Sequence, residues 1–252
     1  MGQLGYVINN GPTIASRALL NDLPFYRRVP IHQDGVSAPA IHWLVPGENT
    51  LALEVYAHDE AAAPHSLVEA SIRRMEENDV LARVGWPQMW EGVPEEERKL
   101  PARAQVVFHL DDDIPPPLWQ DSASEAIPKE GTSELMSAVY ALHDALDKRD
   151  ARLFVDLMNV KVDDMARYHG KTGLLDPREV ELDFAERFKE PVRVEKFEAE
   201  RLRFDARQKG RVVHVTRDDG RRVLSFTNAD DTAGFSLDPF FVRHGGSWRL
   251  YR

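Results

Sequence analysis

The stretch that decides how this chain is organised is residues 111–132, DDDIPPPLWQDSASEAIPKEGT. Three consecutive aspartates lead into three consecutive prolines, and a segment rich in Ser, Glu, Pro and Gly follows. Prolines have no amide hydrogen to donate and hold the backbone extended, so this composition is typical of a semi-rigid linker. We therefore predict a first domain over residues 1–114, a linker over residues 115–131 and a second domain over residues 132–252.

Upstream of this linker, hydrophobic residues alternate with other residues over short runs. Residues 51–55 alternate in this way after the turn PGEN at 46–49, and the runs 67–73 and 104–110 have the same period. A period of two places one face of a strand in a core. Several short strands separated by turn residues predict that the first domain is an all-β sandwich.

Downstream of the linker, the pattern changes to helices followed by strands. Three helices are predicted to begin near Ser133, Asp150 and Asp176, because each of these residues can cap a helix that carries an apolar stripe. Strand-like runs follow over residues 192–204, 211–217, 221–227, 235–243 and 248–251. Asp219-Gly220 and Gly245-Gly246 are typical of hairpin turns. Helices first and an antiparallel meander after them predict an α+β second domain.

The composition excludes several classes of protein. Lys and Arg number 32 against 42 Asp and Glu, and the resulting charge of -10 repels phosphate backbones, so nucleic-acid binding is not expected. A partner that binds an acidic face should itself be basic. The absence of cysteine removes disulfides, thiol nucleophiles and thiolate metal sites. No apolar run approaches the roughly 18 residues of a membrane span, so we expect a soluble protein without one.

The beginning of the chain leaves its compartment open. Residues 1–5 lack the basic region and the apolar stretch of a secretion signal, and they run directly into strand-like residues 6–8. This start fits an intact cytoplasmic protein. It equally fits a periplasmic or other extracytoplasmic protein from which an export signal has been removed.

Two segments resemble known families. Residues 133–252, with a charged segment at 144–150 and the ending GGSWRLYR at 245–252, resemble the nuclear-transport-factor-2-like superfamily, which includes polyketide-cyclase-like proteins. This resemblance implies a cone in which three helices pack on a curved antiparallel sheet around a pocket, a scaffold used by isomerases, dehydratases and cyclases and by non-catalytic binding domains. The stretch WLVPGENTLALEV at 43–55 resembles galactose-binding-like β-sandwiches appended to glycoside hydrolases, which implies sugar binding as one alternative.

A pocket in the second domain would have one candidate pair of catalytic residues. His143 and Asp147 are four residues apart on a predicted helix, so they can act together as a general base and its orienting carboxylate. The structural alternative is an ordinary half-buried histidine paired with a carboxylate. Tyr140, Tyr168 and His169 are candidate ligand-binding residues of the same cavity, with plain core packing as the alternative.

The first domain has a candidate binding segment in Trp86 and Trp90, which lie on either side of Pro87, Gln88 and Met89. Exposed tryptophans bind partners or sugars through their large flat surface, whereas the simpler alternative is a loop folded over the sheet edge. No pair among the histidines of this domain has the close helical spacing of a zinc site, and the acidic clusters at 111–113 and 230–231 do not match a calcium loop. No metal site and no cofactor are predicted.

Two functional hypotheses from different classes follow. The first is a non-enzymatic binding or interaction protein that recognises a protein, expected to be basic, or a small ligand. The second is a small-molecule lyase or isomerase that uses His143 as its base in the pocket of the second domain. A homodimer is compatible with both, because an exposed sheet face of such an α+β domain is commonly covered by a second copy.

Overall fold

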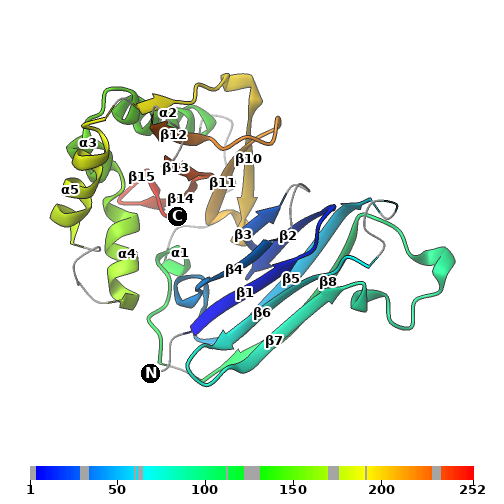
Figure 1. Ribbon diagram of the computed structural model, residues 1–252. Coiled ribbons are helices and arrows are strands. Elements are labelled where there is room, and N and C mark those ends of the chain that lie inside the picture. Colours follow the sequence, from blue (N-terminus) through cyan, green and yellow to red (C-terminus); the bar gives the residue numbers. More distant parts are fainter. Residues whose placement is uncertain are drawn as a thin grey trace. The chain divides into compact units, whose positions relative to one another are not determined.

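The computed structural model is rich in β-structure and folds into two compact units, residues 1–117 and 118–252 (Figure 1). It contains four antiparallel sheets and five helices in the part of the chain that it describes. The described residues are 4–28, 34–59, 61, 65–111, 113–121, 131–169, 176–190, 192–228 and 234–252.

The first unit consists of two four-stranded sheets whose strands contact each other. One sheet has the order β4-β1-β6-β7, formed by Asp34–Pro39, Leu4–Asn10, Val68–Arg74 and Asp79–Trp86. The other has the order β3-β2-β5-β8, formed by Leu23–Arg28, Ile14–Leu20, Gly47–His58 and Ala102–Leu110. Short 3₁₀ turns η1 (Ile41–Trp43), η2 (Gln88–Trp90) and η3 (Glu95–Glu97) lie in the connections. The three strands predicted from a period of two are confirmed as β5, β6 and β8.

The PGEN turn at the start of β5 is held by one buried side chain. The amide of Asn49 accepts a hydrogen bond from Val45 N at 2.9 Å and donates one to Val45 O at 2.8 Å. Its Oδ1 also accepts a bond from Asn21 Nδ2 at 2.8 Å, which joins this turn to the one between β2 and β3. Gly47 lies in the left-handed region with a φ of 82°, where a glycine has no steric penalty.

The second unit contains the five helices and two further sheets. The helices are α1 (Leu118–Asp121), α2 (Gly131–Asp147), α3 (Ala151–Leu157), α4 (Asn159–His169) and α5 (Pro177–Arg187). A four-stranded sheet has the order β10-β11-β14-β15, formed by Leu202–Arg207, Val212–Arg217, Phe240–His244 and Ser247–Leu250. A three-stranded sheet has the order β13-β12-β9, formed by Gly234–Leu237, Leu224–Asn228 and Val192–Val194. The 3₁₀ turns η5 (Ala199–Arg201) and η6 (Gln208–Gly210) flank β10.

Two helices begin at the capping residues predicted for them, whereas α2 begins at Gly131, two residues before Ser133. Asp150 Oδ1 accepts a hydrogen bond from Leu153 N at 2.9 Å at the start of α3, and Asp176 Oδ1 accepts one from Arg178 N at 2.8 Å at the start of α5. Each bond satisfies an amide that the first turn of a helix leaves without a partner. These two predicted caps are confirmed.

The core of the second unit is filled by large apolar side chains. The predicted α2 stripe is confirmed, because its four members are all at most 2% exposed: Leu135, Val139, Leu142 and Leu146. Beside it, Phe154 contacts Phe184 and Phe235 with ring centroids 4.9 and 5.8 Å apart. Phe188 and Phe226 extend this group of rings. The interior beneath α3 and α5 is therefore packed with phenylalanine rings.

Three elements differ from the sequence-based expectation. The single helix predicted to begin near Asp150 is two helices, α3 and α4, because the chain leaves helical geometry at Met158, where ψ is 4°. The strand predicted over 192–204 is interrupted between β9 and β10. The segment predicted as a linker contains α1, and the side chain of Trp119 in this helix is buried.

The two predicted hairpin turns have different outcomes. Gly245-Gly246 joins β14 to β15, which pair directly, and both glycines have positive φ values of 59° and 79° as a two-residue turn requires. The hairpin at Asp219-Gly220 is wrong, because β11 and β12 belong to different sheets. Asp219 instead uses its carboxylate to hold Arg217 and the amide of Arg221, which fixes the connection in another way.

Candidate functional site

The structure brings two of the predicted site residues, Tyr140 and His143, together with Phe197 at the surface of the second unit. The rings of Tyr140 and Phe197 are stacked, with centroids 5.4 Å apart and an interplanar angle of 28°. His143 meets Phe197 edge-on at 5.2 Å and 90°. Tyr140 remains 42% exposed. These three residues are called the Tyr140 surface below.

The predicted pair of His143 and Asp147 is not assembled in this arrangement. His143 Nε2 lies 3.2 Å from the backbone carbonyl oxygen of Glu195, so this ring nitrogen faces a peptide group. Asp147 is exposed at the end of α2, and within the described residues no hydrogen bond connects it to His143. The histidine therefore ties α2 to the segment at 195–198 and has no carboxylate to orient it in the described part of the chain.

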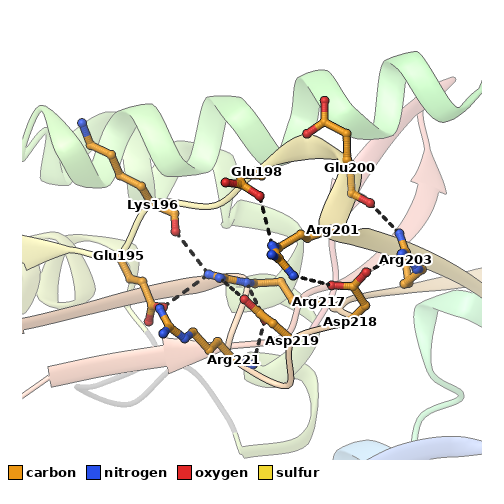
Figure 2. A network of polar contacts seen from close by, with 10 residues as sticks. All are labelled: Glu195, Lys196, Glu198, Glu200, Arg201, Arg203, Arg217, Asp218, Asp219 and Arg221. Atoms are coloured by element: carbon orange, nitrogen blue, oxygen red, sulfur yellow. Dashed lines mark hydrogen bonds and ion pairs between the residues drawn. The ribbon is translucent and has the colours of Figure 1, made fainter.

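That segment is held from its other side by Arg217, the last residue of β11 (Figure 2). The side chain of Arg217 is 4% exposed, and its Nε donates to Asp219 Oδ1 at 3.0 Å. Its Nη1 contacts Glu195 Oε1 at 3.4 Å and the carbonyl oxygens of Lys196 and Arg222 at 3.3 and 3.5 Å. The hydrogen bond from Arg217 lowers the pKa of Asp219 below its usual value, against the smaller opposing effect of desolvation.

The outer part of this network consists of exposed ion pairs (Figure 2). Arg221 Nη1 lies 3.1 Å from Glu195 Oε1, and Arg201 bridges Glu198 at 3.0 Å and Asp218 at 3.5 Å. Exposed pairs of this kind are screened by solvent and contribute little to stability. Arg217 is the anchor, because it is the buried member and bonds to two carboxylates and two carbonyl groups at once.

The resulting surface can receive a cationic group. Tyr140 and Phe197 offer aromatic area whose position is fixed by the packing of α2 and by the Arg217 network. The carboxylates of Asp144, one turn after Tyr140 on α2, and of Glu198, next to Phe197, are 60% and 72% exposed, and each forms an ion pair at the surface, with Lys148 at 3.3 Å and with Arg201 at 3.0 Å. Aromatic rings attract cations within about 6 Å of the ring centre, and adjacent carboxylates add to that attraction.

Tyr168 belongs to a different place, a buried polar cluster between α4 and the residues after β15. Asp164 is 0% exposed and forms an ion pair with Arg252, which is 3% exposed. Arg252 Nη2 also donates to the hydroxyl of Tyr251 at 3.0 Å. The hydroxyl of Tyr168 is buried without a hydrogen-bond partner among the described residues, and burial, with the negative charge of Asp164 adding to it, raises its pKa.

Lys161 on α4 lies beside the same cluster. Burial lowers the pKa of Lys161 from 10.5 to about 8, and the positive charge of Arg252 adds to this shift. Lys161, Asp164 and Tyr168 are at positions i, i+3 and i+7 of α4, a spacing that places them on one face. This spacing of polar residues on α4 could have indicated the cluster from the sequence. The contact with Arg252 could not have been predicted, because it depends on tertiary structure.

The remaining predicted residues lie elsewhere. His169 is the last residue of α4, and its side chain lies outside the described part. Trp86 ends β7 at 5% exposure, packed between His58 at 4.8 Å and Trp90 at 5.5 Å. Trp86 is therefore largely covered, and of this pair only the half-buried Trp90 offers aromatic area to a partner.

Two absences concern the described residues alone. They contain no group of three or more His, Cys, Asp or Glu residues placed to hold a metal ion. None of their helices is both long and apolar enough to cross a membrane.

Comparison of the chain with protein-family models, with curated proteins and with solved structures finds no match.

Proposed function

We propose that this chain is a non-enzymatic binding protein that recognises a basic protein partner through the Tyr140 surface. The observation that carries the proposal is the stacked pair of Tyr140 and Phe197, in which Tyr140 stays 42% exposed and the half-buried Phe197 supports it, while His143 and the Arg217 network hold the pair in place. Binding energy in protein interfaces concentrates on such aromatic anchors. An anchor that is already fixed loses little conformational entropy when the partner arrives.

Charge supports a basic partner. The chain carries a net charge of -10, and the exposed carboxylates of Asp144 and Glu198 lie on the two segments that supply the aromatic pair. A Lys or Arg side chain over the ring of Tyr140 would gain about 0.5 to 2 kcal/mol, according to how far it is desolvated. Complementary charge also speeds association, and this gain falls as salt is added.

The packing of the second unit favours binding over the lyase or isomerase alternative. An enzyme of that kind needs His143 and other polar groups directed into a cavity. His143 instead faces the backbone of Glu195, and the interior contains the contacting rings of Phe154, Phe184 and Phe235. The same proposal takes the first unit as a β-sandwich and the second as a nuclear-transport-factor-2-like cone used for recognition. The two contacting sheets of the first unit support the β-sandwich, and the helices and antiparallel sheets of the second unit support the cone.

Selection from a displayed library of random peptides, which offers probes of every charge, tests the proposal. The immobilised protein should enrich peptides that carry Lys or Arg, and titration calorimetry should show binding that weakens as salt is raised. Tyr140→Ala should weaken the selected peptides by at least about tenfold, the usual effect of removing an aromatic anchor. Phe197→Ala should act in the same direction.

Leu182→Ala is the matched control, because Leu182 is a 62% exposed apolar residue on α5 that takes no part in the Tyr140 surface. It should leave the affinity unchanged. Circular dichroism should confirm that each variant is folded before it is compared. Selection of acidic peptides would remove the basic partner from the proposal, and equal affinity of the wild type and Tyr140→Ala would remove the surface itself.

A further inference from the structure

Four charged residues form one row across the β3-β2-β5-β8 sheet of the first unit. Arg27 on β3 is directly opposite Arg17 on β2, Arg17 is opposite Glu54 on β5, and Glu54 is opposite Arg103 on β8. Opposite residues on neighbouring antiparallel strands lie on the same face of a sheet. Because strands are about 4.8 Å apart, the row spans about 14 Å.

Glu54 organises the row. Its Oε2 accepts hydrogen bonds from Arg17 Nε at 2.9 Å and Nη2 at 2.6 Å, and its Oε1 accepts one from Arg103 Nη1 at 3.0 Å. Tyr56 also donates its hydroxyl to Oε2. Burial by itself would raise the pKa of Glu54, but the hydrogen bonds from Tyr56 and Arg17 and the charges of both arginines hold it below its usual value. The carboxylate is therefore ionised and fixes two guanidinium groups.

Arg17 is further constrained by an aromatic ring. Its guanidinium carbon lies 5.6 Å from the centre of the Tyr56 ring, and this ring is itself 42% exposed. Nε and Nη2 of Arg17 are both engaged by Glu54, whereas Nη1 makes no hydrogen bond with the described residues. Nη1 of Arg17 can therefore donate to a ligand, and Glu54 and the Tyr56 ring already hold the side chain in place.

The positive charge of the row is not balanced within the described residues. Glu54 is the single carboxylate facing three arginines, and the exposed Arg27 has no ion pair or hydrogen bond in the described part of the unit. Like charges directly opposite each other on neighbouring strands are destabilising. The free protein therefore keeps a repulsive pair, Arg27 and Arg17, that an anion placed over both would relieve.

We propose that this row binds a ligand carrying two or more oxyanion groups. One oxyanion group would lie over Arg27 and Arg17, whose strands are about 5 Å apart. Another would lie near Arg103, whose strand is about 10 Å beyond that of Arg17. Guanidinium groups fit carboxylate, sulfate and phosphate oxygens equally well as hydrogen-bond donors, so the shared chemistry is a multiply charged oxyanion. The site is on the first unit and independent of the Tyr140 surface.

Titration calorimetry with citrate and with tripolyphosphate tests this site, with acetate at matched ionic strength as the monovalent comparison. The wild type should bind at least one of the two multivalent probes and show no measurable heat with acetate. Arg27→Gln should weaken binding by about tenfold, the loss expected for one charge-assisted contact. Arg103→Gln should weaken it in the same direction. Binding of citrate alone would assign a carboxylate ligand, and binding of tripolyphosphate alone would assign a phosphate ligand.

Arg221→Gln is the matched control, because Arg221 is a 67% exposed arginine of the second unit. It should bind the probes like the wild type. Arg27→Gln removes the repulsive pair, so the thermal midpoint of the free protein should be unchanged or raised. A loss of binding in this variant could then not be attributed to unfolding. Absence of binding to both probes, or equal affinities of Arg27→Gln and the wild type, would overturn the inference.

Discussion

Replacement of Arg217 by methionine should destabilise the second unit and loosen the Tyr140 surface together. The buried guanidinium bonds to Asp219, Glu195 and two backbone carbonyl oxygens, and methionine keeps its approximate length while removing every donor. Loss of one partner of a buried ion pair costs about 3 to 5 kcal/mol. Asp219 and Glu195 are 20% and 33% exposed and regain part of their hydration, so we expect a loss of about 2 to 3 kcal/mol.

Urea unfolding followed by circular dichroism measures this loss as a lower midpoint at unchanged slope. Arg221→Met is the matched control, because Arg221 also binds Glu195 but is 67% exposed, and its free energy of unfolding should change by less than about 0.5 kcal/mol. Arg217→Lys should recover only part of the stability, since one ammonium cannot reproduce the planar set of donors. Equal stabilities of Arg217→Met and Arg221→Met would refute the reasoning that Arg217 anchors the segment at 195–198.

Three further substitutions test the half-buried Lys161, the core and one turn. Lys161 has a folded pKa of about 8 against 10.5, so its charge costs up to about 3 kcal/mol below pH 8, a cost that disappears as the pH rises to 10.5. Lys161→Met should therefore raise the free energy of urea unfolding at pH 7, and a gain that does not shrink by pH 10 would contradict this. Phe154→Ala, at a fully buried ring, should lower that free energy by about 3 to 5 kcal/mol, whereas a loss below about 1 kcal/mol would mean that the rings do not form the core. Gly246→Ala should lower the thermal midpoint by an amount equivalent to about 1 kcal/mol, because a φ of 79° is unfavourable for alanine. No atom lies within 4 Å of the added methyl group, so the backbone conformation is the cause of this loss, and an unchanged midpoint would mean that the turn has another geometry.

The features that could be predicted from the sequence are those set by neighbouring residues. The apolar spacing of α2 and the caps at Asp150 and Asp176 depend on one or two turns of chain, and the structure has them where the sequence indicates. The Gly245-Gly246 hairpin has the same origin, because two glycines with positive φ match the twist of the strands that they join.

The features that could not be predicted depend on residues far apart in the chain. Asp219-Gly220 has the composition of a hairpin turn, but Asp219 is engaged by Arg217 and the following strand pairs in another sheet. The pair of Asp164 and Arg252 joins residues 88 positions apart. His143 could be selected from its spacing to Asp147, and Tyr140 as an aromatic residue of the same predicted helix. Their neighbour Phe197 lies in the run 192–204 that was predicted as one strand, and its contact with α2 depends on the interruption of that strand between β9 and β10.

Hydrogen–deuterium exchange of the chain with and without a selected basic peptide locates the surface that binds the peptide. We expect added protection in residues 133–147 and 192–198, the two segments that supply Tyr140, His143 and Phe197. Tyr140→Ala should lose this protection under the same conditions. Protection confined to the first unit, or to α4 and the residues after β15, would contradict the account, because the recognition surface would then lie elsewhere.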